Sequence, residues 1–236
     1  MKKRILSILL LCCMVLTLLP TTVLAADGPM DTIPKYDVSI DVYNRTSDIS
    51  IKDSRSYYIY SSVPDKLRDT WAWDKKIFIK GDKAAPHVFI DGVNIEMSPS
   101  SKGPAIELNK KASAYIYFIG KNSSLQGADG RAAIQKNRSE GQLYVLARTG
   151  TTVTCKGGDK AAGIGGSYAT RNIFNGYYNG DMYGHGVNMH FGSQTNPDYW
   201  GGTINATGGE YGAGIGAGSW GHSGHSGNTI HGGAGE

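Results

Sequence analysis

The chain has 236 residues, of which 33 are glycine, and a formal net charge of +4 at pH 7. Three of its 24 basic residues stand at positions 2–4, and the other 21 are nearly balanced by 20 acidic residues. Because nucleic-acid binding needs a dense basic face, this composition argues against a nucleic-acid partner. The chain is long enough to bury a core of its own.

Residues 1–25 have the pattern of a secretory signal peptide. Three basic residues precede an apolar run over 5–19, and small or β-branched residues follow at 23–25. The apolar run is too short for a comfortable membrane span. We therefore expect a secreted, extracellular protein that meets the membrane only through this segment during export. A retained N-terminal anchor is the alternative.

Cysteine usage bears on how such a domain is stabilised. Cys12 and Cys13 lie inside the expected signal peptide, so the mature chain keeps only Cys155. No internal disulfide can then form, and a secreted domain without disulfides needs a real core or extensive backbone pairing. We expect Cys155 itself to be a small buried apolar residue.

Residues 26–74 are expected to form an N-terminal β cap or the first turns of a larger structure. Apolar and polar residues alternate over 38–44, 50–53 and 57–62, which is typical of half-buried strands. Residues 64–75 suit a loop or a short helix. A cap is expected where a stack of strands would otherwise expose its edge and its core.

Residues 75–236 contain a recurring unit. Residues 152–166 (TVTCKGGDKAAGIGG) align with 203–217 (TINATGGEYGAGIGA) without a gap, and 123–134 and 95–106 fit the same shape. Each unit ends in a small residue followed by isoleucine, and the units are 28, 30 and 51 residues apart. The recurring isoleucines are Ile106, Ile134, Ile164 and Ile215. A unit of this size cannot bury its own apolar face and is expected to stack on its neighbours.

The units are made of strands. Their apolar runs are short, β-branched or aromatic, and bounded by glycine, asparagine, aspartate and serine. The expected fold is therefore all-β, a single-stranded parallel β-helix (β-solenoid), with the four isoleucines stacked as an internal structural ladder about 4.8 Å apart. The glycine pairs at 157–158 and 208–209 are expected at corners with positive φ.

The 51-residue spacing leaves an excursion over 167–202 that holds one strand-like segment, 187–191. Aromatic rings gather there, and sugars present C–H faces that stack on such rings. The candidate ligand-binding residues are Tyr177, Tyr178, Asp181, Tyr183, Tyr199, Trp200 and, beyond the excursion, Trp220. A weaker second candidate is the pair Trp71 and Trp73. The alternative is that these aromatics simply pack the loop against the coil.

Metal sites are weaker candidates. Asp129, Asp159 and Glu210 occupy matching positions of three units, and a column of carboxylates could bind Ca²⁺; the alternative is a solvated corner. His222 and His225 lie three residues apart, but in a Gly/Ser loop that preorganises a metal poorly. No motif of a catalytic or nucleotide-binding site is present, so we assign no catalytic residue and no other cofactor.

The order IDGVNIEM, then YIYFIGKNSSLQGADGRAAIQ, then TCKGGDKAAGIGG resembles secreted surface proteins of Gram-positive bacteria with AGIGGG-type repeats. The resemblance covers roughly residues 75–236. It implies a right-handed parallel β-helix, a place on the bacterial cell surface, and a carbohydrate-binding or adhesin-like role. Such proteins usually continue with more repeats and a wall anchor, so we expect the repeat domain to extend beyond residue 236.

Three functions follow as hypotheses. The first is a cell-surface binding or adhesion module for a polysaccharide or cell-wall glycan, which needs an aromatic and asparagine-lined surface. The second is a polysaccharide lyase or glycoside hydrolase of the same architecture, which needs clustered Asp, Glu, Lys or Arg along a groove. The third is a structural stalk, which needs neither. The sequence leaves the oligomeric state open.

Overall fold

We analysed a computed structural model of the chain. The structure describes residues 34–101, 103–109, 111–136, 140–174, 177–180, 186–193, 196, 198–223 and 230–231. Within 169–180 and 220–231 it describes the backbone alone. The expected signal peptide at 1–25 lies outside these residues. Among the described residues, no helix is long and apolar enough to cross a membrane.

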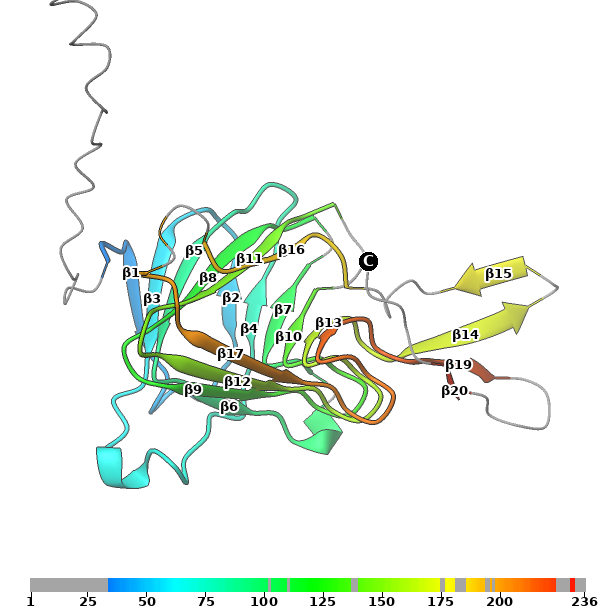
Figure 1. Cartoon of the computed structure of the whole chain (residues 1–236), viewed down its shortest axis with the longest axis horizontal. Coiled ribbons are helices and arrows are strands. Elements are labelled where there is room, and N and C mark those ends of the chain that lie inside the picture. Colours follow the sequence, from blue (N-terminus) through cyan, green and yellow to red (C-terminus); the bar gives the residue numbers. More distant parts are fainter. Residues whose placement is uncertain are drawn as a thin grey trace, which may run out of the picture. The chain divides into compact units, whose positions relative to one another are not determined.

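The described chain is all-β, as predicted, with only two short 3₁₀ helices, η1 (Asp65–Leu67) and η2 (Pro99–Ser101). Three sheets, here called A, B and C, contain only parallel pairs (Figure 1). Sheet A consists of β1 (Val38–Asp41), β3 (Ser56–Tyr60), β5 (His87–Asp91), β8 (Ala114–Ile119), β11 (Leu143–Ala147) and β16 (Met189–Phe191). Sheet B consists of β2 (Ile49–Ile51), β4 (Ile77–Ile79), β7 (Ile106–Leu108), β10 (Ile134–Gln135), β13 (Ile164–Gly165) and β18 (Ile215–Gly216). Sheet C consists of β6 (Asn94–Glu96), β9 (Ser123–Gln126), β12 (Thr152–Lys156) and β17 (Thr203–Thr207).

The chain visits these sheets in a fixed rotation. From β5 onward it passes through sheet A, then C, then B, and then returns to A; β8, β9 and β10 follow this order, as do β11, β12 and β13. Parallel neighbours need a crossover connection. Here the strands of the other two sheets supply that connection, so each strand pairs with its equivalent in the next repeat.

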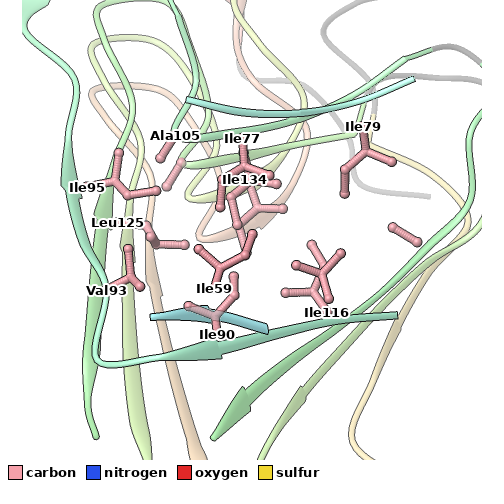
Figure 2. Close-up of a cluster of buried hydrophobic side chains, with 14 of the residues drawn as sticks. Ile59, Ile77, Ile79, Ile90, Val93, Ile95, Ala105, Ile116, Leu125 and Ile134 are labelled. Atoms are coloured by element: carbon pink, nitrogen blue, oxygen red, sulfur yellow. The ribbon is translucent and has the colours of Figure 1, made fainter. Parts of the chain in front are cut away.

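The interior is filled by in-register apolar rows. Ile106 pairs with Ile134, Ile134 with Ile164, and Ile164 with Ile215. The row begins earlier than the sequence pattern indicated, because Ile49 and Ile77 precede Ile106 in the same register. Side chains from all three sheets point into one core, as Figure 2 shows for Ile90, Ile95 and Ile134 among others.

Residues 38–74 join the same sheets. Strands β1 and β3 extend sheet A, β2 extends sheet B, and Trp73 forms an isolated bridge to Ile95 of sheet C. Trp73 is buried, and its indole Nε1 donates to the Arg45 carbonyl at 2.8 Å. Trp71 packs against the core and meets the Tyr43 ring edge-on. Both tryptophans therefore serve packing at this end of the core, which leaves little of Trp73 for a ligand.

The glycine pairs do not adopt the backbone conformation expected of them. Neither pair has positive φ; the left-handed corner positions are Lys160 and Tyr211, at φ 63° and 64°. The pairs are instead required by close approach, because a Cβ on Gly158 would lie 1.9 Å from the Ala128 carbonyl oxygen. Glycine permits both a positive φ and the close approach of another backbone segment. The sequence pattern predicted the first at these pairs, whereas the structure requires the second.

The excursion contributes a hairpin to a fourth sheet. Strands β14 (Ala169–Phe174) and β15 (Tyr177–Gly180) form an antiparallel hairpin. A second hairpin of β19 (Trp220–Ser223) and β20 (Ile230–His231) joins it, because β14 and β19 pair in parallel. The strand-like segment at 187–191 contains β16, which adds to sheet A. A hairpin thus follows the strand of sheet B in two successive repeats, after β13 and after β18.

The isoleucine row predicts a graded effect of truncation. Ile134 is fully buried, whereas Ile215 in the last described repeat is 46% exposed. We expect Ile134→Ala to lower the free energy of unfolding by about 2–5 kcal/mol, because it leaves a cavity in a closed core. Ile215→Ala should cost much less, roughly 1 kcal/mol. Urea unfolding of both variants checks this, and equal losses would contradict the buried row.

A buried lysine predicts how stability depends on pH. Lys136 is fully buried, and burial lowers its pKa to about 8. In the unfolded chain its pKa returns to about 10.5, so between these values the unfolded state binds more protons and stability rises with pH. Lys136→Met should remove this rise. Urea midpoints between about pH 7 and 9 measure it, because at higher pH the Cys155 thiol and the tyrosines, whose pKa values burial raises, oppose the rise; a wild-type midpoint that does not rise in this range would contradict the prediction.

Candidate functional site

The outer face of sheet A carries two rows of mostly aromatic side chains, here called the aromatic face. Alternation along each strand sends Ile116 and Phe118 into the core and Tyr115 and Tyr117 outward. Because neighbouring strands pair in register, outward residues of successive strands line up. The first row is His87, Tyr115, Tyr144 and His190, and the second is Tyr58, Phe89 and Tyr117.

The rings of the first row stack face to face. The ring centroids are 4.7 Å apart between His87 and Tyr115, 4.5 Å between Tyr115 and Tyr144, and 4.5 Å between Tyr144 and His190. The ring planes lie within 14° of parallel. Stacked rings cover one another's faces, so this row presents ring edges, hydroxyl groups and ring nitrogens. His190 uses its Nε2 to contact Gln142 Oε1 at 2.8 Å.

The second row forms a small apolar cluster outside the main core. Tyr58, Phe89 and Ile119 are buried there, and Tyr117 and Trp200 pack against them. The Tyr58 hydroxyl donates to Asp91 Oδ2 at 2.8 Å, and burial raises the pKa of that tyrosine. Burial likewise raises the pKa of Tyr117 to about 12, so its hydroxyl stays protonated at neutral pH.

The loop over 196–202 brings two of the predicted ligand-binding residues to this face. Trp200 lies 5.1 Å from the Tyr117 ring at a 40° tilt, and Tyr199 meets Trp200 edge-on at 89°. The loop is fixed to sheet A because Thr149 N donates to the Tyr199 carbonyl at 2.8 Å. The Arg148 guanidinium stacks over the Tyr199 ring at 5.5 Å. The sequence pattern fits both packing and ligand binding, and Trp200 packs on the sheet while staying half-exposed.

For the other predicted ligand-binding residues, the structure describes the backbone alone or does not describe the residue. Tyr177 and Tyr178 lie in β15, and Trp220 lies in β19, so their backbones belong to the fourth sheet. Asp181 and Tyr183 lie outside the described residues. Sequence reasoning missed the rows of sheet A, although His87, Tyr115 and Tyr144 follow one another at 28 and 29 residues, close to the repeat length.

A groove of about 630 Å³ lies beside the outer face of sheet C, and it is here called the polar groove. Its floor consists of outward side chains of sheet C, including Asn94, Ser124 and Thr154, which are in register on neighbouring strands. Its rim consists of charged side chains from η1, the residues after it and a turn between sheets A and C: Asp65, Arg68, Asp69 and Lys121. No local motif marks it in the sequence.

Three of the four charges on the rim are paired with one another. Asp65 Oδ1 accepts hydrogen bonds from Lys121 Nζ at 2.8 Å and from Arg68 Nη2 at 3.3 Å. The bond from Lys121, followed by the charge of that ammonium and then by Arg68, holds the pKa of Asp65 below its usual value. Asp65 is therefore ionised at neutral pH and unsuited to act as a general acid, which needs a raised pKa.

Two of the three carboxylates predicted as a calcium site have other partners. Asp159 Oδ2 pairs with Lys160 Nζ at 3.1 Å, and the hydrogen bond from Tyr211 to Glu210 raises the pKa of that tyrosine. No group of three His, Cys, Asp or Glu side chains that could hold a metal ion occurs in the described part of the chain, which includes Asp129. These three residues thus do not come together as a metal site, and His222 and His225 lie where side chains are not described.

Cys155 is an inward residue of sheet C. It pairs with Leu125 and Ala206 on the neighbouring strands and is fully buried. Burial raises the pKa of its thiol to about 12, so the thiolate is scarcely populated at neutral pH. This residue is part of the core and offers no nucleophile.

The chain matches no protein-family model, no curated protein and no solved structure. Evidence on function therefore comes from two surfaces of the chain itself. The aromatic face offers stacked ring edges with Tyr199 and Trp200 beside them. The polar groove offers hydroxyl and amide groups in register with paired charges at its rim.

Proposed function

We propose that the chain is a secreted, cell-surface binding module that recognises a polysaccharide through the aromatic face and the loop carrying Tyr199 and Trp200. The observation that carries this proposal is the position of Trp200, half-exposed and packed on Tyr117 beside two rows of rings. Secretion rests on the signal-peptide pattern of residues 1–25, and a bacterial cell surface on the resemblance of residues 75–236.

The architecture proposed for this module is a single-stranded parallel β-helix in which sheets A, B and C are the three faces. Support comes from the fixed rotation of the chain through the sheets and from the in-register pairing of equivalent strands. Residues 26–74 serve as its N-terminal cap and first turns. A right-handed coil follows from the family resemblance.

Ring orientation favours Trp200 as the residue that stacks on a sugar. The rows of sheet A hide their ring faces in near-parallel stacks. Tyr199 and Trp200 lie in no such stack, since they cross at 89°. Each of these rings is packed on one side, Tyr199 by the Arg148 guanidinium and Trp200 by Tyr117, and the larger indole makes Trp200 the better platform. Polar groups nearby, such as the Tyr117 hydroxyl, can bond sugar hydroxyls.

A polysaccharide lyase or glycoside hydrolase is the second candidate, because the polar groove gathers Asp65, Asp69, Arg68 and Lys121. The ion pair of Asp65 with Lys121 weakens this candidate, since it stabilises the ionised carboxylate where a hydrolase needs a proton donor. A structural stalk is the third candidate, and it leaves both surfaces without a ligand.

Trp200→Ala tests the proposed binding surface. A glycan array identifies a ligand of the wild-type protein, and calorimetry then compares variants on that glycan. We expect Trp200→Ala to weaken binding roughly tenfold or more, because tryptophan platforms dominate such contacts. Tyr211→Asn is the control, since Tyr211 is an exposed aromatic residue at a left-handed position that asparagine tolerates.

Three outcomes would contradict the proposal. Equal affinity of Trp200→Ala and Tyr211→Asn, with unchanged melting temperatures, would remove Trp200 from the site. Release of unsaturated products from an acidic polysaccharide would favour the lyase. Failure to bind any glycan on the array would favour the stalk.

A further inference from the structure

We propose that the polar groove is a second glycan-binding site, specific for a chain that carries carboxylates, such as a uronate polymer. In the free protein the Asp65 carboxylate occupies the place between Arg68 and Lys121 that a ligand carboxylate takes. This site lies over sheet C and is separate from the aromatic face over sheet A.

Arg68 is held firmly in the polar groove. The Arg68 side chain is only 16% exposed, and its Nη1 donates to the Gly92 carbonyl at 3.1 Å. The Arg68 carbonyl also accepts from Asn94 Nδ2 at 2.9 Å, which ties the segment after η1 to sheet C. The guanidinium is therefore fixed before any ligand arrives, which reduces the entropy lost on binding.

The Asp65 carboxylate, which lies between Arg68 and Lys121, is held more loosely than Arg68. The Asp65 side chain is 82% exposed, and a single oxygen, Oδ1, serves both Lys121 and Arg68. Ion pairs this exposed contribute about 0–1 kcal/mol, so a ligand carboxylate can displace Asp65 at little cost. On the guanidinium edge that carries Nη2, the Nε atom is buried and has no hydrogen-bond partner in the described structure.

The floor of the groove favours a sugar chain over other carboxylates. Asn94, Ser124 and Thr154 follow one another in register, and Asn205 continues the row on β17. Such a row places one hydroxyl or amide group about every 4.8 Å, close to the length that one pyranose unit takes in an extended chain. The Asn94 amide bonds Arg68 and Ser124, so the hydroxyl groups of Ser124 and Thr154 remain for a ligand. Among the described residues, no apolar side chain lines the groove, so an acidic peptide would find no pocket for its side chains.

The test measures binding of an oligogalacturonide hexamer by calorimetry, with a neutral hexasaccharide as the comparison ligand. Lys121→Gln should weaken binding of the acidic hexamer roughly three- to tenfold, because it removes one charged donor. Asp65→Asn should tighten binding by a similar factor, because it removes the competing carboxylate while keeping the size of the side chain. Lys156→Gln is the matched control, since Lys156 is exposed on sheet C outside the groove.

Tighter binding by Asp65→Asn is the decisive result, because a purely structural role of Asp65 would not produce it. The proposal is overturned if Asp65→Asn binds no better than wild type, if Lys121→Gln behaves like Lys156→Gln, or if the neutral hexasaccharide binds as well as the acidic one. Trp200→Ala should leave this affinity unchanged, which separates the groove from the aromatic face. Free galacturonate should bind far more weakly than the hexamer, and equal affinity would reduce the site to an anion contact.

Discussion

In the last two described repeats, the corner between sheets C and B lies so close to the preceding repeat that glycine alone fits at Gly158 and Gly209. A Cβ on Gly158 would lie 1.9 Å from the carbonyl oxygen of Ala128 in the preceding repeat. One repeat later, a Cβ on Gly209 would lie 2.0 Å from the carbonyl oxygen of Gly158. Because the same contact recurs, these two repeats sit on the ones before them in one register, and Ile164 and Ile215 continue the isoleucine row of sheet B in that register.

The register also determines what the outer faces present. Each repeat adds one side chain to every row, so the chemistry of a face is the chemistry of one position repeated. On sheet A that position is aromatic and produces stacked rings, whereas on sheet C it is an amide or a hydroxyl. Loops then modify the rows: the segment holding Trp200 covers part of the aromatic face, and η1 brings Asp65 and Arg68 to the edge of the polar row.

Much of this arrangement could be predicted from sequence, because the two gapless copies place equivalent residues in register on neighbouring strands. The isoleucine positions and the all-β character follow from that alignment. The aromatic face was not predicted, although its rings recur at nearly the repeat length. Residues such as Tyr115 alternate with core residues, and this alternation is typical of any half-buried strand. The polar groove had no local signal, since Asp65 and Lys121 are 56 residues apart and meet only through the conformation of a loop.

The glycine contact is the element on which the stacking account depends, and Gly158→Ala tests it most directly. Gly103→Ala is the matched control, because a Cβ there would lie nearest to the flexible end of Met97, at 3.0 Å. Urea unfolding should show Gly158→Ala destabilised by roughly 3 kcal/mol or more, since a rigid carbonyl cannot move aside, and Gly103→Ala by less than about 1 kcal/mol. A Gly158→Ala protein as stable as the control would contradict the account.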